Sequence, residues 1–361
     1  MIYLDHAATT KPTKPAIDAF LRCAENFANP SSLHLGGIEA EKEIAAARKV
    51  LAGIVGAKPS EIFFTSGGTE ANNLAVFGGA KKHKGRRIIT TRGEHPSILE
   101  PLAKLRGDFE IVYLDSFDEL QKALAEPTCL VATHHVNNES GGIVDISAIG
   151  NLIKMASPAT LFHVDAAQSF CKMPIDVNAA KIDMMSISAH KIGGFKGCGA
   201  LFVRNGVSIS PMIFGGGQEN GLRSGTENVA GIAAFAAAAK DFWQNQRKHL
   251  DHVLELNNKF CQIVETTDGI NINNTNTSPY ILDLDIANIR SEVLVNALSA
   301  KGVYVSSGAA CSAGKKLKNS PRTETALRIS FGADNTLEEI DKAAEILLET
   351  IEVLRKSVRI K

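Results

Sequence analysis

Short β-rich runs alternate with helical stretches between about residue 60 and residue 205, and this alternation limits the possible folds more than any other feature of the chain. The runs with strand character are EIFFT (61–65), RRIITT (86–91), FEIVYL (109–114), CLVATHHV (129–136), ATLFHVD (159–165), DMMSIS (183–188) and ALFV (200–203). Amphipathic or alanine-rich stretches such as TEANNLAVFGGA and DISAIGNLIKMA lie between several of them. Strands that alternate with helices tend to pair in parallel, so the sequence predicts an α/β fold with a mostly parallel central sheet flanked by helices.

The flanks of this region predict long helices. Apolar residues recur at helical spacing in GIEAEKEIAAARKVLAGIVG (37–56), and residues 227–266 have the pattern of one or two further helices. The chain closes with the amphipathic stretch LEEIDKAAEILLETIEVLRK (337–356), which an Asn-Thr start signal precedes.

The length predicts two closely associated domains, because 361 residues exceed one ordinary core. We expect a large domain over residues 16–245 and a smaller α/β domain over residues 246–361. The N-terminal segment, residues 1–15, is expected to join the small domain.

Charge and composition argue against several classes of function. Thirty-nine basic side chains balance thirty-nine acidic ones, so the chain lacks the basic footprint of a protein that binds nucleic acid or an anionic membrane surface. The first residues, MIYLDHAATTKP, do not resemble a signal peptide, and the longest apolar run, near residues 230–239, is too short to span a bilayer. The six cysteines are scattered without a CxxC pair, which favours a reducing cytoplasm.

A lysine follows a predicted buried strand in SAHKIGGFKGCGAL (188–201). A charged amine at that position is costly unless it is neutralised or used, and formation of a Schiff base does both. Alone, Lys191 is better explained as a lysine that emerges from the strand into solvent.

An aspartate ends the preceding strand in HVDAAQS (163–169), with Gln168 three residues further on. The carboxyl ends of parallel strands meet where α/β proteins bind ligands, and a carboxylate there can pair with the ring nitrogen of a pyridoxal group. Asp165 could equally be the N-cap of a following helix. The two interpretations are comparable until Lys191 is considered with them.

A glycine turn in TSGGTEANN (65–73) leads from a strand into a helix that begins near Thr69. Free backbone N–H groups and the helix dipole at such a turn attract an anion. By itself this is a weak signal, since many glycine turns serve only to start a helix.

A cysteine lies among small residues in SSGAACSAGKK (306–316), a stretch with almost nothing to bury. An exposed thiol without a use is open to oxidation, so Cys311 is a candidate functional residue. Core or incidental packing is the better interpretation for Cys23, Cys129, Cys171, Cys198 and Cys261.

Ten segments in register give the chain a resemblance to the pyridoxal-phosphate-dependent class V aminotransferases, specifically the NifS/IscS-type cysteine desulfurases. They are YLDHAATT (3–10), NPSSLH (29–34), TSGGTEANN, GEHPSILEP (93–101), HVNNESG (135–141), HVDAAQS, SAHKIGG, GGGQENGLRSGTENV (215–229), SSGAACSAG and LRISFG (327–332). The resemblance covers nearly the whole chain and implies the aspartate aminotransferase-like fold of pyridoxal-phosphate-dependent transferases, with pyridoxal 5'-phosphate as the cofactor.

The resemblance also implies roles around the cofactor. Lys191 would form the Schiff base and move a proton on the substrate carbon, while Asp165 would pair with the ring nitrogen. His95 would stack on the ring and assist proton transfer, although a capping or core histidine beside Pro96 is the plainer interpretation. The remaining cofactor contacts would come from Gln168 and Asn138 at the ring hydroxyl and from Gly68, Thr69, Ser188 and His190 at the phosphate.

Substrate and subunit contacts follow from the same resemblance. Arg328 would bind the substrate carboxylate, with help from Asn29. Without the family, Arg328 would be taken for a surface strand arginine. Thr226 would reach the phosphate bound by the other subunit, which implies a homodimer.

The implied reaction removes sulfur from L-cysteine, leaves a persulfide on Cys311 and releases alanine. The sulfur would pass to an acceptor protein, either a scaffold of iron–sulfur cluster assembly or a protein of tRNA or cofactor thiolation, and the sequence does not identify which. A selenocysteine lyase would share every cofactor motif, and a class V aminotransferase acting on a small amino acid would need no loop thiol. Two positions depart from the family pattern. Phe195 stands where proline is frequent, and Ala309 stands where serine is common. Modest effects are expected from both.

Overall fold

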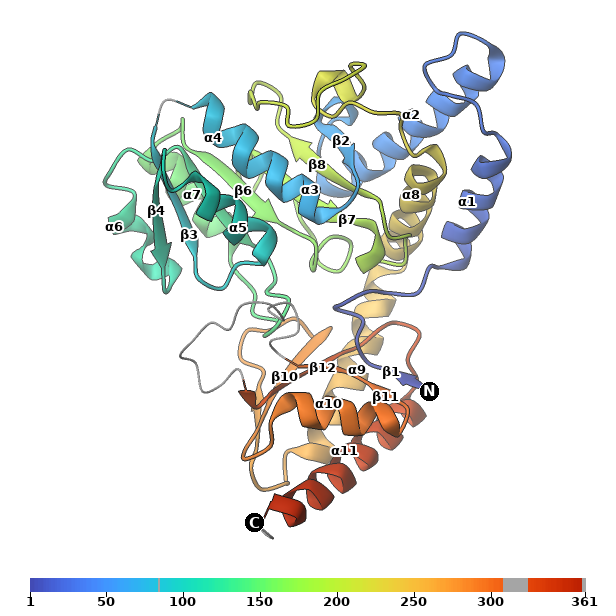
Figure 1. Ribbon diagram of the computed structural model, residues 1–361, viewed down its shortest axis with the longest axis vertical. Coiled ribbons are helices and arrows are strands. Elements are labelled where there is room, and N and C mark those ends of the chain that lie inside the picture. The colour runs from blue at the N-terminus through green and yellow to red at the C-terminus, as the bar shows by residue number, and fades with distance from the viewer. Residues whose placement is uncertain (84, 308–323, 359–361) are drawn as a thin grey trace. The chain divides into compact units, whose positions relative to one another are not determined.

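The computed structural model describes residues 1–83, 85–307 and 324–358, and the chain divides into two compact units (Figure 1). Unit 1 comprises Met1–Thr10, Val136–Ile143 and Arg247–Lys361, and unit 2 comprises Lys11–His135 and Val144–Gln246. The first ten residues therefore group with the C-terminal part of the chain. Val136–Ile143 groups with them too, whereas the sequence expectation assigns this segment to the large domain.

Unit 2 is built on a seven-stranded sheet with the order β2-β8-β7-β6-β5-β3-β4. The strands are β2 (Ile62–Thr65), β3 (Arg87–Thr91), β4 (Glu110–Leu114), β5 (Leu130–His134), β6 (Leu161–Asp165), β7 (Met184–Ser188) and β8 (Gly199–Val203). Strands β3 to β7 pair in parallel, and β8 runs antiparallel to both of its neighbours. The predicted α/β fold with a mostly parallel sheet is confirmed.

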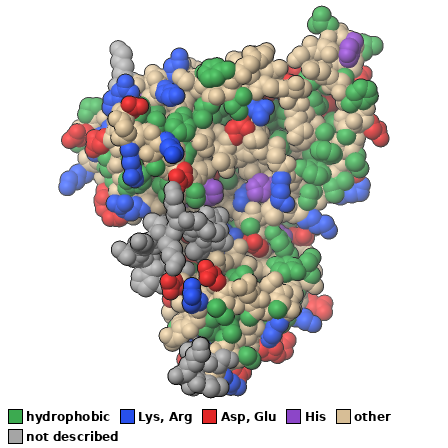
Figure 2. All heavy atoms as spheres, in the orientation of Figure 1, with side chains coloured by type: hydrophobic (Ala, Val, Ile, Leu, Met, Phe, Trp, Pro, Cys, Tyr) green, Lys and Arg blue, Asp and Glu red, His purple; other side chains and the backbone are tan. Residues whose placement is uncertain are grey.

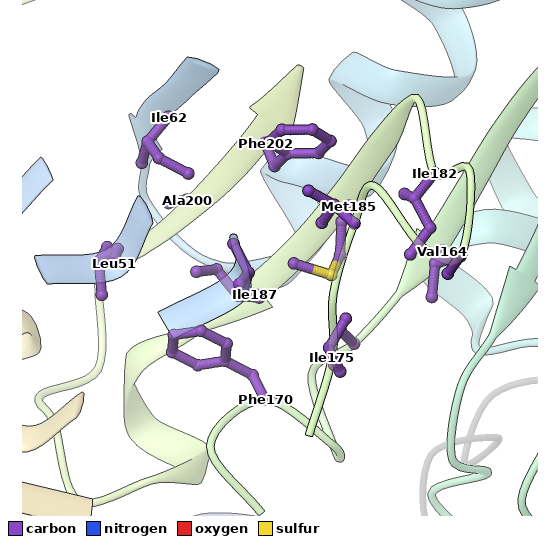
Figure 3. Close-up of a cluster of buried hydrophobic side chains, with 14 of the residues drawn as sticks. Leu51, Ile62, Val164, Phe170, Ile175, Ile182, Met185, Ile187, Ala200 and Phe202 are labelled. Atoms are coloured by element: carbon purple, nitrogen blue, oxygen red, sulfur yellow. The ribbon is translucent and has the colours of Figure 1, made fainter. Parts of the chain in front are cut away.

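Helices cover both faces of this sheet because successive strand residues point to opposite sides. Ile89 and Met185 pack with α2 (Leu35–Val55), α7 (Ile146–Ala156) and α8 (Val229–Gln244) in one buried cluster, part of which Figure 3 shows. Their neighbours Ile88 and Met184 pack with α3 (Gly68–Asn73) and α5 (Pro96–Leu105) in another. Burial on both faces explains why these strands are apolar without polar alternation.

Helices α2, α7 and α8 follow the predicted patterns closely. Helix α2 covers the expected amphipathic stretch and ends at Gly56, whose φ of 72° is the left-handed conformation that glycine adopts most readily. Helix α3 continues into a five-residue π-helix, Leu74–Gly78, and then into α4 (Gly79–Lys82). The other helices here are α1 (Lys14–Glu25) and α6 (Leu120–Ala123).

Unit 1 contains a four-stranded sheet with the order β12-β13-β10-β9 and a short parallel pair formed by β1 and β11. The strands are β1 (Ile2–Tyr3), β9 (Ile270–Asn273), β10 (Ile281–Ile286), β11 (Val303–Tyr304), β12 (Ser306–Ser307) and β13 (Ala326–Ser330). The helices are α9 (Gln246–Val264), α10 (Ser291–Ala300) and α11 (Leu337–Val358). No helix in the described part of the chain is long and apolar enough to cross a membrane.

Candidate active site

The parallel strands of unit 2 bring several polar side chains to one edge of the sheet. Asp165 is the last residue of β6, and the register places it beside His134, the last residue of β5. Ser188 ends β7, and Lys191 follows it in a single 3₁₀ turn, Ala189–Lys191. Because carboxyl ends of parallel strands form the usual ligand-binding edge of such a sheet, these residues mark the candidate site.

Both carboxylate oxygens of Asp165 accept hydrogen bonds. Oδ1 accepts from the backbone N–H of Ala167 over 2.9 Å, and Oδ2 accepts from Nδ2 of Asn72 over 2.7 Å. The first bond resembles the expected cap, but residues 167–172 form turns rather than a helix. Asp165 is 7% exposed, so its position is fixed by these bonds in a buried setting.

His95 is the N-cap of α5, as the plainer interpretation of the sequence predicts. Its Nδ1 accepts from the backbone N–H of Ser97 over 3.1 Å and lies 2.7 Å from Oγ of Ser97. Burial is the main cause that lowers the pKa of His95, and Lys191 lowers it further, while Asp165 and Glu94 act in the opposite direction. His95 therefore lies within electrostatic range of both Asp165 and Lys191.

Positive side chains gather around Lys191. Burial, followed by the charges of Lys191, Lys196 and Lys172, lowers the pKa of His190 to about 4, so this imidazole is neutral near pH 7. The side chain of Lys172 is buried, and burial together with Lys191 lowers its pKa to about 7. Sequence reasoning missed Lys172, whose only local signal is a lysine within an otherwise apolar stretch.

The glycine turn before α3 has the features of an anion site. Gly67, with a φ of 155°, is the N-cap and supplies no side-chain cap, which leaves the first N–H groups of α3 for another acceptor. A Cβ atom on Gly68 would lie 3.6 Å from the Cβ atom of Ser188, so the start of α3 faces the end of β7. Oγ of Ser188 is buried and has no hydrogen-bond partner among the described residues.

Arg328 is 3% exposed, so the interpretation of this residue as a surface arginine is wrong. Within unit 1, its Nη1 donates to the backbone oxygen of Asn138 over 2.8 Å and its Nη2 donates to Oδ1 of Asp5 over 2.8 Å. Two residues that the sequence assigns to substrate and cofactor thus come together, with Asn138 contacted through its backbone.

Other predicted residues are not brought together by any described contact. Asn29 is exposed, and its Oδ1 accepts from the backbone N–H of Ser31 over 2.9 Å. Thr226 is also exposed and lines a cavity of about 110 Å³ with Ser66, which precedes the glycine turn. Gln168 is buried. Cys311 lies outside the described residues.

The remaining cysteines behave as packing residues. The side chains of Cys23, Cys129, Cys171 and Cys198 are buried, which confirms the core interpretation for these four, and Cys261 is half-buried. Burial raises the pKa of Cys129 and of Cys261 to about 11, which makes both poor nucleophiles at neutral pH. Among the residues that the structure describes, no cluster of His, Cys, Asp and Glu could hold a metal ion.

Comparison with known proteins places this geometry in a family. The family model described as "Aminotransferase class-V" matches residues 2–343. The chain belongs to this family. A cysteine desulfurase IscS of Dictyoglomus turgidum is 38% identical to this class V chain, over 98% of the chain and 95% of that protein.

Solved structures of relatives share the fold of this class V family member. A NifS-like protein superposes with a TM-score of 0.91 at 34% identity and covers 98% of this chain and 99% of its own. A structure of SspA in complex with cysteine superposes with a TM-score of 0.81 at 31% identity and covers 93% of this chain and 100% of its own.

The family implies pyridoxal 5'-phosphate as cofactor, and the residues of this site fit that group. An uncapped helix start and the buried hydroxyl of Ser188 suit a phosphate. Asp165 supplies a fixed carboxylate for a ring nitrogen, and Lys191 supplies an amine in the same electrostatic neighbourhood.

Proposed function

We propose that this chain is a pyridoxal-phosphate-dependent cysteine desulfurase, which converts L-cysteine to L-alanine and a protein-bound persulfide. The observation that carries the proposal is the grouping of His95, Asp165 and Lys191 at one sheet edge. The resemblance to proteins named cysteine desulfurase over almost the full chain supports the same conclusion.

Each cofactor contact has a residue in this chain to make it. Gly68, Thr69, Ser188 and His190 would hold the phosphate, Asp165 the ring nitrogen, and Gln168 and Asn138 the ring hydroxyl. When bound, pyridoxal 5'-phosphate withdraws electrons from the substrate carbon. The amine of Lys191 would attach the cofactor and carry a proton to and from that carbon, with His95 assisting, while Arg328 and Asn29 would orient the substrate carboxylate.

The sulfur step would need a thiolate, which we assign to Cys311. Its Sγ attacks the substrate sulfur, so that a new S–S bond forms and the C–S bond of the substrate breaks. The electron pair of the broken bond stays with the substrate carbon, which takes up a proton and leaves as part of alanine. The persulfide on Cys311 would then pass to an acceptor protein.

We also propose that the protein is a homodimer and acts in the cytoplasm. Phe27 and Leu33 are each 95% exposed near the junction of α1 and α2, and Phe214 is 81% exposed. Figure 2 shows hydrophobic side chains on the surface at that end of unit 2. A second copy of the chain would cover such side chains and bring its phosphate to Thr226. The free cysteines fit a reducing compartment.

Substitution of Cys311 tests the sulfur step. Cys311→Ala is expected to keep bound cofactor but to release no sulfide from L-cysteine in the presence of a reductant. Cys261→Ala is the matched control and should release sulfide at the wild-type rate, because its thiol is half-buried and its pKa is raised. Unchanged sulfide release in Cys311→Ala would assign the chain to another reaction.

Substitution of Lys191 tests the cofactor link. Lys191→Ala is expected to contain no cofactor bond that borohydride can reduce, whereas the wild-type protein contains one. A reducible bond in the variant would move this role to another lysine, with Lys172 the first to examine. Comparing wild-type rates on cysteine and selenocysteine separates a desulfurase from a selenocysteine lyase.

A further inference from the structure

A buried series of hydrogen bonds joins Asp165 to His95 through two residues without an assigned role. Nδ2 of Asn72 donates to Oδ2 of Asp165 over 2.7 Å and to Oγ of Ser97 over 2.8 Å. Oγ of Ser97 in turn lies 2.7 Å from Nδ1 of His95. Asn72 and Ser97 are 1% and 6% exposed, so water competes little for these bonds.

The orientation of the Asn72 amide follows from its partners. An amide nitrogen carries two protons, and here one points to a carboxylate and the other to a hydroxyl oxygen. Turning the amide over would place Oδ1 against the carboxylate of Asp165, which is electrostatically unfavourable. Oδ1 therefore faces Nε2 of His163, 2.9 Å away.

His163 secures the far side of this amide. Its ring is fully buried, and burial lowers its pKa to about 4, only partly opposed by Asp165 and by a backbone hydrogen bond with Met184, so the ring is neutral near pH 7. Since Oδ1 of Asn72 can only accept, the single ring proton of His163 lies on Nε2. Both N–H groups and the oxygen of the Asn72 amide thereby each have a partner.

The same logic fixes the proton on His95. The backbone N–H of Ser97 donates to Nδ1 of His95, so Nδ1 carries no proton. Oγ of Ser97 accepts a hydrogen bond from Nδ2 of Asn72, which leaves its own hydroxyl proton to donate to Nδ1 as well. A ring that accepts two donors at Nδ1 is neutral and carries its proton on Nε2.

We propose that Asn72 is a positioning residue, which through Ser97 holds His95 as the neutral tautomer with its proton on Nε2. The catalytic consequence rests on the proposed function: His95 would begin the reaction able to donate a proton from Nε2 rather than to accept one there. Because one amide contacts both Asp165 and Ser97, the side chain that orients the carboxylate also sets the state of the imidazole.

Nuclear magnetic resonance of the histidine rings tests this arrangement in the full-length protein as purified, with ¹⁵N-labelled histidine. Loss of one set of signals in His95→Gln assigns His95. The wild-type protein should show the proton of the neutral ring on Nε2. Asn72→Ala frees the Ser97 hydroxyl to accept from Nδ1, so the titration midpoint of His95 should rise by about half to one pH unit, the effect of one hydrogen bond.

The neighbouring Asn73 provides a matched control. Its amide donates to the backbone oxygen of Thr69 over 2.8 Å and has no hydrogen bond to this series among the described residues. Asn73→Ala should therefore leave the His95 titration unchanged. Glu94, Asp165 and Lys191, the charged groups that act on His95, are present in every variant.

A double-mutant cycle separates the path through Ser97 from a direct effect of Asp165. In a Ser97→Ala background, Asn72→Ala should shift the His95 midpoint by less than half of its effect in the wild-type background. Equal shifts in the two backgrounds, no shift with Asn72→Ala, or a wild-type proton on Nδ1 would each overturn the proposal.

Ser97→Ala gives an independent result if Asn72→Ala fails to fold, since it removes only one hydroxyl. The backbone N–H of residue 97 still donates to Nδ1 of His95, but Nδ1 loses the second of its two donors. The fraction of His95 with its proton on Nδ1 should therefore increase, and an unchanged fraction would overturn the proposal. These measurements need neither substrate nor turnover. Their failure would leave the desulfurase assignment standing, and a chain inactive on cysteine could still show the shift.

Discussion

Arg328 has two expected roles, in folding and in binding the substrate carboxylate, and a double-mutant cycle with Asp5 separates them. Nη2 of Arg328 lies 2.8 Å from Oδ1 of Asp5, and the two side chains are only 4% and 18% exposed. Oδ1 also accepts from Oγ of Ser306 over 2.9 Å. Bulk salt screens such a pair little, and a charged hydrogen bond of this kind contributes about 2 kcal/mol.

The magnitudes of the three variants follow from this pair. Arg328→Gln leaves Asp5 charged and mostly buried, so it should cost about 3 kcal/mol, more than the pair itself contributes. Asp5→Asn should cost about 2 kcal/mol, and the double variant about 3 kcal/mol, because the second substitution then breaks nothing further. For unit 1, with roughly 130 residues, a loss of about 3 kcal/mol lowers Tm by about 10 °C if the unit unfolds by itself.

Differential scanning calorimetry measures these changes, and steady-state kinetics measures the second role. Arg328→Gln should raise KM for L-cysteine at least about tenfold, since the loss of one charged hydrogen bond exceeds 1.4 kcal/mol. Asp5→Asn should change KM less than about threefold, because Nη1 and Nη2 of Arg328 are retained. Additive stability losses would refute the ion-pair reasoning, and equal increases in KM would refute a separate substrate role.

Three shorter predictions concern unit 2. Ser188→Ala should weaken the binding of pyridoxal 5'-phosphate about fivefold to tenfold, the effect of one hydrogen bond, and an unchanged Kd in equilibrium dialysis would exclude Oγ as a phosphate ligand. Burial lowers the pKa of His134, but Glu94, with its Oε2 3.0 Å from Nδ1, raises it above the ordinary value overall. The His134–Glu94 pair should therefore make the wild-type protein more stable than Glu94→Gln, by the full amount below about pH 6.5 and by progressively less as pH rises through the folded pKa of His134. A constant difference between the two proteins in the free energy of urea unfolding from pH 5.5 to pH 8.5 would contradict this. The rings of Phe195 and Phe20 are in contact, with their centroids 4.7 Å apart. Phe195→Ala should therefore lower the free energy of unfolding by about 1 to 2 kcal/mol in the same assay and should keep its cofactor. An unchanged stability would show that the contact is dispensable.

The sheet of unit 2 could be predicted from the sequence because its signals are local. Each strand is a short apolar run between turn residues, and every predicted run overlaps one observed strand to within three residues at either end. The antiparallel direction of β8 has no such local signal, since strand direction depends on the path of the connecting chain. The π-helix after α3 was missed for a related reason. Gly78 approaches a distant backbone there, and a Cβ atom on it would lie 2.6 Å from the carbonyl oxygen of Ser210.

The partners of the site residues could not be predicted, because they come from distant parts of the chain. Asn72 and Asp165 are 93 positions apart, and Arg328 and Asp5 are 323 apart. Residue type indicates that Asp165 can bind a ring nitrogen, but only the fold shows which donors hold its two oxygens. His95 shows that a structural role and a functional one can coincide, since the N-cap of α5 also lies within electrostatic range of Asp165 and Lys191.

The amine of Lys172 is expected to take up a proton when the cofactor binds. Burial, then the charge of Lys191, lowers the pKa of Lys172 to about 7, so this amine is about half protonated at pH 7 in the free protein. A bound phosphate, and the loss of a free ammonium at Lys191, would both favour the charged form of Lys172 and raise its pKa. Cofactor binding near pH 7.5 should therefore take up about half a proton more in the wild-type protein than in Lys172→Met, and its affinity should fall more steeply with rising pH. Titration calorimetry in buffers of different ionisation enthalpy measures this difference, and equal uptake by the two proteins would show that Lys172 does not respond to the cofactor.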